Sequence, residues 1–197
     1  MSKIAIEGNA SGTGTFTIAS PNSNSSRTLS LPDGTGTFVV NGINSSIVSG
    51  TAVASTSGTS IDFTSIPSWV KRITVMFNGV STNGSSIPMI QLGDAGGVEN
   101  TGYAGYSFNP STAATSTAGA TLAGQWAAAA TLYGVVSICL IGSNAWAISF
   151  SGSAPGLNTI CVSGYAKTLS DTLTQVRITT VNGTDTFDAG TINILYE

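Results

Sequence analysis

Apolar and other residues alternate along several stretches after residue 60, and this pattern predicts a succession of β-strands. Alternation within 72–77 is typical of a strand that is buried on one face. The stretch 135–141 is apolar apart from one serine, which predicts a strand largely buried on both faces. A turn at 142–144 joins it to the alternating stretch 145–150, so the two predict a hairpin. The positions expected to be mainly buried are Ile73, Val75, Phe77, Ile138, Leu140, Ile148, Val162, Val176 and Ile178.

Further strands are predicted where turn residues separate apolar stretches. An Asn-Gly pair precedes the strand expected at 87–92, and a second Asn-Gly pair follows the strand expected at 173–181. Strands at 160–166 and 191–196 complete the set. A series of about eight short strands between turns predicts an all-β fold, an antiparallel, jelly-roll-like β-sandwich over 61–197.

The stretch 100–130 is less regular, and it predicts a long loop with one short helical turn at 127–130. Loops of this length within a compact domain are often functional. Exposed aromatic rings in such a loop could stack on sugar rings, although large aromatics also pack in cores and between subunits. The candidate surface-recognition residues in this stretch are Tyr103, Tyr106, Phe108 and Trp126.

The first 42 residues differ from the rest, because they contain short polar strand-like stretches between turns and few large apolar groups. Strands this short cannot enclose a core and need a partner surface or other copies of themselves. We therefore expect an extended attachment arm over 1–42 and a Ser-, Thr- and Gly-rich linker over 43–60. The apolar side chains expected to anchor the arm on its partner are Phe16, Ile18, Leu29, Leu31 and Phe38.

Charge is sparse: charged residues make up 8% of the chain, against about 25% in typical soluble proteins. The formal net charge is −3 and no basic run occurs, which argues against nucleic-acid binding. No apolar run is long enough to insert into a membrane. The N-terminus does not lead into an apolar run, so we expect no signal peptide and synthesis in the cytoplasm. Cys139 and Cys161 lie in apolar stretches, which favours two buried, unpaired thiols over a disulfide.

Catalytic chemistry has few candidates in this chain. There is no histidine, which removes the commonest general base and metal ligand and makes a Ser-His-Asp arrangement impossible. Two carboxylate pairs, Asp94 with Glu99 and Asp185 with Asp188, are close in sequence. Glycoside hydrolysis needs two converging carboxylates, but we interpret both pairs as turn features. We expect no enzymatic activity, no cofactor and no metal site.

Three stretches carry a family resemblance. Residues 11–39, with the core 24–37 (NSSRTLSLPDGTGT), resemble a short repeat at the start of many phage tail-fibre and virion proteins. Residues 58–77 (GTSIDFTSIPSWVKRITVMF) resemble the opening of a β-domain in phage structural proteins, and 190–197 are also similar to its ending. The resemblance implies a virion protein that docks through its arm and is usually trimeric. It carries no site residues with it.

Three functional hypotheses follow. The leading one is a phage tail fibre, anchored by its arm and binding the host surface, a polysaccharide, through the β-domain. The alternative is a capsid decoration or head-fibre protein whose arm staples neighbouring capsid subunits. The third, from a different class, is a glycan-cleaving enzyme. In the first two, the partners are other virion proteins and further copies of the chain in a homotrimer.

Overall fold

A computed structural model of the chain describes residues 11–15, 17, 22–26, 28 and 47–197. The chain divides into two units, 1–38 and 39–197. In the first unit every described residue is exposed, and none of them belongs to a strand. The prediction that a set of apolar side chains anchors the arm stays a prediction, because all of its members lie outside the described residues: Phe16, Ile18, Leu29, Leu31 and Phe38.

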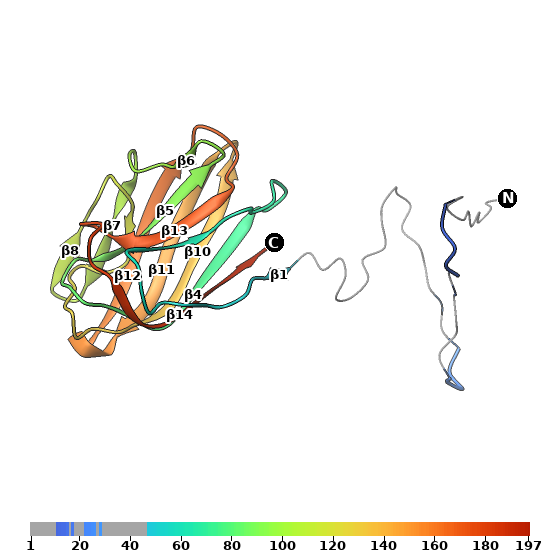
Figure 1. Cartoon of the computed structure of the whole chain (residues 1–197), viewed down its shortest axis with the longest axis horizontal. Helices are drawn as coiled ribbons and strands as arrows, with labels where there is room; N and C mark the ends of the chain where they lie inside the picture. Colours follow the sequence, from blue (N-terminus) through green and yellow to red (C-terminus); the bar gives the residue numbers. More distant parts are fainter. Residues whose placement is uncertain (1–10, 16, 18–21, 27, 29–46) are drawn as a thin grey trace. The chain divides into compact units, whose positions relative to one another are not determined.

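The second unit is built from two antiparallel sheets (Figure 1). The larger sheet contains, in spatial order, β1 (Val48–Ser49), β14 (Phe187–Tyr196), β4 (Arg72–Thr82), β10 (Leu132–Gly142), β11 (Ala145–Ala154), β12 (Thr159–Thr168), β7 (Ala104–Asn109) and β8 (Thr112–Ala114), with β2 (Val53–Ala54) also paired to β14. The smaller sheet contains β3 (Ser60–Phe63), β13 (Gln175–Thr180), β5 (Pro88–Asp94) and β6 (Gly97–Val98), with β9 (Ala120–Thr121) paired to β5.

The helical content of the described chain is one 3-10 turn, Pro155–Leu157, between β11 and β12. Among the described residues, no helix has the length and apolar character needed to cross a membrane.

Local turn chemistry explains the connections between strands. The hairpin predicted around 142–144 is present, since β10 and β11 pair antiparallel over most of their length. The Asn-Gly turn after β13 is also present: Gly183 has a φ of +68°, and its N–H donates to the carbonyl of Thr180 at 3.0 Å. A φ in this range costs glycine little because it has no Cβ.

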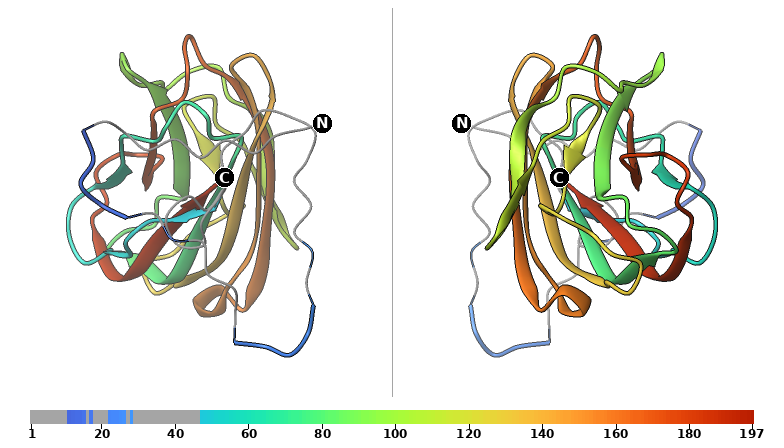
Figure 2. Two further views of the ribbon diagram at one scale, coloured as in Figure 1. Left: turned by 90° about the vertical axis from the view of Figure 1, so that its right-hand side faces the viewer. Right: turned by 90° about the vertical axis from the view of Figure 1, so that its left-hand side faces the viewer.

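The core lies between the two sheets, whose inward side chains form one apolar cluster. Figures 1 and 2 show the two sheets as the layers of a sandwich. The predicted all-β antiparallel sandwich is therefore confirmed. The period-2 prediction of buried positions is confirmed for most of its members, since alternate residues of a strand face the same side. The confirmed buried residues are Ile73, Val75, Phe77, Ile138, Ile148, Val176 and Ile178.

Two core predictions need correction. Val162 is 42% exposed, because β12 turns Cys161 and Tyr165 inward instead. A shift of one residue exchanges the two faces of a strand, and the neighbouring residues here are apolar on both faces. Leu140 is only partly buried, although it packs against the core. The stretch 135–141 is buried on one face rather than both, since Val135 is 41% and Ile141 67% exposed.

Two stretches expected to lack regular structure contribute strands. Within the predicted linker, β1 and β2 both pair with β14 and so extend the larger sheet. Within the predicted loop 100–130, β7 and β8 continue the larger sheet and β9 joins the smaller one. The alanine run forms a reverse turn in which the Ala130 N–H donates to the carbonyl of Ala127 at 2.9 Å, and the expected helical turn is absent there.

Candidate functional site

The four aromatic residues predicted as a recognition surface separate into two pairs. Tyr106 and Phe108 lie on β7 and are exposed by 68% and 47%, respectively. Tyr103 and Trp126 are buried, with exposures of 2% and 7%. The prediction of surface recognition is therefore wrong for Tyr103 and Trp126, which belong to the core.

Both buried aromatics use their polar atoms internally, as buried Tyr and Trp side chains usually do. The hydroxyl of Tyr103 accepts the backbone N–H of Leu92 at 2.5 Å. The indole N–H of Trp126 donates to the hydroxyl oxygen of Thr82 at 3.0 Å. Burial raises the pKa of Tyr103 well above its usual value. These contacts indicate that Tyr103 and Trp126 stabilise the core.

The exposed pair belongs to a wider surface, which we call the apolar face: the outer side of β7, β10, β11 and β12. Seven of the eleven large hydrophobic side chains that are exposed in the described chain lie on it. An exposed apolar area of this kind usually marks an interaction surface. Its large members are Tyr106, Phe108, Tyr133, Val135, Ile141, Ile160 and Val162.

Strand register places these side chains in rows across the apolar face. Val135 lies opposite Ser151, which lies opposite Val162, which in turn lies opposite Phe108. β11 presents only small residues between the larger ones of β10 and β12. The four strands contain one charged residue, Lys167, and its side chain is buried. The apolar face is therefore uncharged across its width.

The smaller sheet has a different outer side. A shallow depression of about 300 Å³, which we call the polar groove, lies over β5 and β13. Its floor is formed by outward residues of the two strands, with Met89 opposite Thr179 and Gln91 opposite Arg177. Further residues around it come from the start of β3 and the residue before it, from the segments before β7 and after β8, and from the end of β13 and the turn after it: Thr59, Ser60, Asn100, Ala118, Thr180, Val181, Asn182 and Gly183.

The floor of the polar groove is held by hydrogen bonds. Arg177 donates from Nε and from Nη2 to the two carboxylate oxygens of Asp62, both at 2.7 Å. This bidentate pairing raises the pKa of Arg177 above its usual value. The amide of Gln91 donates to the carbonyl of Ala118 at 2.8 Å. The floor is thus preorganised, and its one cation is neutralised by a neighbouring carboxylate.

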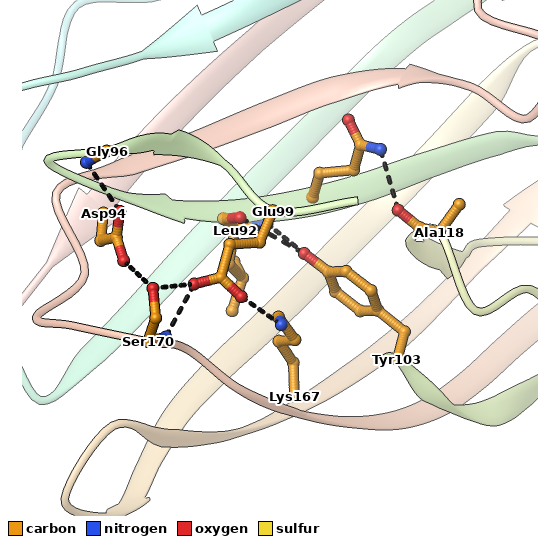
Figure 3. Close-up of polar contacts among 9 residues, drawn as sticks. Leu92, Asp94, Gly96, Glu99, Tyr103, Ala118, Lys167 and Ser170 are labelled. Atoms are coloured by element: carbon orange, nitrogen blue, oxygen red, sulfur yellow. Dashed lines mark hydrogen bonds and ion pairs between the residues drawn. The ribbon is translucent and has the colours of Figure 1, made fainter. Parts of the chain in front are cut away.

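The structure also brings together Asp94 and Glu99, the first of the two carboxylate pairs singled out in the sequence (Figure 3). The hydroxyl of Ser170 lies 2.7 Å from a carboxylate oxygen of Asp94 and 2.8 Å from one of Glu99. The Ser170 N–H donates to Glu99 at 2.7 Å. Lys167 forms an ion pair with the other oxygen of Glu99. The sequence did not predict Lys167 or Ser170, because they are far from this loop along the chain.

This cluster stabilises charged carboxylates. Hydrogen bonds from Ser170 and from the Gly96 N–H lower the pKa of Asp94. Burial raises the pKa of Glu99, but the bonds from Lys167 and Ser170 outweigh it, so the pKa lies below its usual value. A general acid needs a raised pKa. Both carboxylates are therefore suited to fastening the β5–β6 hairpin to the loop after β12, and unsuited to protonating a leaving group.

The remaining candidates are structural as well. Asp185 accepts hydrogen bonds from the N–H of Ser86 at 2.8 Å and from the amide of Asn182 at 2.7 Å, as expected of a turn residue. Cys139 and Cys161 are unpaired, and β11 separates their strands. No group of three potential metal ligands occurs within the part of the chain that the structure describes.

Comparison with known proteins found no matching family model, no matching curated protein and no matching solved structure. The functional argument therefore depends on the two surfaces, the uncharged apolar face on one sheet and the polar groove on the other.

Proposed function

We propose that this chain is a non-enzymatic structural protein of a bacteriophage particle, a tail fibre that is anchored by residues 1–42 and binds the host surface through its β-sandwich. The observation that carries the proposal is the apolar face. Four adjacent strands present large apolar side chains and no charge to their outer side. A surface of this composition suits a protein that works while packed against others.

Further copies of the same chain are the occupants we propose for the apolar face. Three such faces can pack around a threefold axis without burying a charge, so their contact avoids the desolvation cost of an unpaired ion. The large apolar side chains of β10 and β12 form rows, with the small residues of β11 between them. The large side chains of one copy can therefore pack against the small residues of the next copy. That three copies assemble, rather than two, rests on the resemblance of 24–37 to phage fibre repeats.

The mass of the full chain in solution tests this assembly. We expect a homotrimer, and we expect Val162→Glu, at the middle of the apolar face, to give a monomer that retains its fold. The control is Thr184→Glu, which adds the same charge to an exposed turn and should leave the mass unchanged. A monomeric wild-type protein, or an unchanged mass for Val162→Glu, would contradict the assembly.

The alternatives differ in location and in chemistry. A capsid decoration protein would have the same apolar face but lie on the head. A glycan-cleaving enzyme is disfavoured at Asp94 and Glu99, because hydrogen bonds and Lys167 hold both carboxylates in their charged form.

Electron microscopy of intact particles that carry an epitope tag at residue 197 tests the location. Label at the tail supports the fibre, label on the shell replaces it by the capsid alternative, and absence of label refutes both. Particles made with a chain that lacks residues 1–42 should lack the label, whereas the truncated chain should still melt cooperatively. Normal incorporation of the truncated chain would show that the anchor is not the arm.

A further inference from the structure

The polar groove lies on the outer side of the smaller sheet, and the apolar face lies on the outer side of the larger one. The core between the sheets separates the two surfaces. A copy packed on the apolar face therefore leaves the polar groove open. The two surfaces can act at the same time, one in assembly and the other in binding.

The composition of the polar groove indicates the class of its ligand. Its side chains carry hydroxyls, carboxamides and one guanidinium, and Met89 and Val181 add apolar surface. Carboxamides and hydroxyls both donate and accept hydrogen bonds, which matches the paired hydroxyls of a sugar ring. A few polar groups placed in this way around apolar contacts are typical of small-ligand sites.

The charge balance of the polar groove indicates whether the sugar is neutral or acidic. Arg177 is its one cationic side chain, and both of its bonds to Asp62 are of good length, at 2.7 Å. An acidic sugar would have to compete with Asp62 for the guanidinium. A neutral sugar can instead bind beside the ion pair. Its hydroxyl oxygens can accept hydrogen bonds from the N–H groups of Arg177 that point away from Asp62.

Backbone pairing argues against an extended peptide as the ligand. β13 lies between β3 and β5, and β5 is paired on its other side with β6 and β9. The two strands that form the floor of the polar groove, β5 and β13, therefore have no free edge, and a peptide seated on the floor could not pair with them through main-chain hydrogen bonds. A ligand that lies on this floor is therefore recognised through side chains.

We propose that the polar groove binds a neutral glycan of the host surface through Asn100 and the unpaired donors of Arg177, above the buried side chain of Gln91. This inference rests on the proposed function, since it names the ligand class and the site of host binding. Gln91 and Arg177 are held in place by Ala118 and Asp62 before the ligand arrives, so little side-chain entropy is lost on binding.

The experiment is binding of the purified full chain to an array of neutral and acidic bacterial surface polysaccharides. We expect retention on neutral glycans. Asn100→Ala removes an exposed carboxamide at the polar groove and should weaken binding about five- to tenfold, as loss of one or two neutral hydrogen bonds does. Val181→Trp should abolish binding by filling the groove. The matched control is Asn78→Ala, an exposed asparagine on the larger sheet, which should bind as the wild type does.

A further variant, Tyr106→Ala, separates the polar groove from the apolar face. Full binding by this variant supports the groove, whereas loss of binding would move the site to the aromatic side chains of β7 and overturn the proposal. Retention on acidic glycans alone, or on none, also overturns it. The result is independent of where the protein lies on the particle, so a capsid location would refute the tail fibre and leave the glycan site standing.

Discussion

The ion pair between Glu99 and Lys167 offers the sharpest test of how this sandwich is held together. The side chain of Lys167 is 5% exposed and that of Glu99 is 22% exposed. Lys167 also lies over the ring of Tyr103, with its ammonium 5.5 Å from the ring centroid. Replacement of Glu99 by Gln leaves a buried ammonium without its counter-charge. We expect the free energy of unfolding to fall by about 3 kcal/mol, which for a domain of this size lowers Tm by about 6–12 °C.

Urea unfolding at pH 7 of a double-mutant cycle measures this effect. The variants are Glu99→Gln, Lys167→Met and the two together. The double variant removes both charges, so its loss of stability should be smaller than the sum of the single losses by about 1.5–3 kcal/mol. Additive losses would show that the pair contributes no interaction energy, and the reasoning from burial would then be wrong.

The pH dependence of stability provides a second test of the ion pair between Glu99 and Lys167. The pKa of Glu99 is lower in the folded protein than its ordinary value of 4.5. The stability from this shift is therefore present above about pH 4.5 and is lost as the pH falls through the lower, folded-state pKa. The stability difference between wild type and Glu99→Gln should shrink below pH 4.5. A difference that stays constant down to pH 3 would contradict the direction of the shift.

Three further predictions concern single positions. Tyr103→Phe leaves a buried backbone N–H without its acceptor and should cost about 1–3 kcal/mol in urea unfolding; an unchanged midpoint would refute the structural role of this hydroxyl. Gly190→Ala should cost at least about 1–3 kcal/mol, because its φ is +94° and a Cβ would clash with the backbone oxygen of Gly79 on β4. Gly164→Ala, where a Cβ meets nothing within 4 Å, is its control and should be close to neutral. A thiol reagent should modify Cys139 before Cys161, because burial raises the pKa of Cys161; equal rates by mass spectrometry would contradict the burial argument.

The sequence alone determined the longer strands and most of the side chains that face the core, but it missed β1, β2, β7, β8 and β9. Alternation is a local property, since successive residues of a strand point to opposite faces whatever the strand pairs with. It was sufficient for Ile73, Val75 and Phe77, whose neighbours on the other face are less apolar. It failed at 160–162, where Ile, Cys and Val are consecutive and either face could have been buried. There the packing of β12 between β11 and β7 determined that Cys161 faces the core.

Only the tertiary structure decided the surfaces that the functional proposals use. Tyr103 and Tyr106 are close in sequence, but the first lies before β7 and enters the core, whereas the second faces outward from β7. The polar groove joins residues from β3, β5 and β13, and the ion pair joins Glu99, just after β6, to Lys167 on β12. These contacts between distant residues depend on which strands are neighbours and on the register in which they pair. Long-range pairing sets both, and a local pattern in one sequence does not encode them.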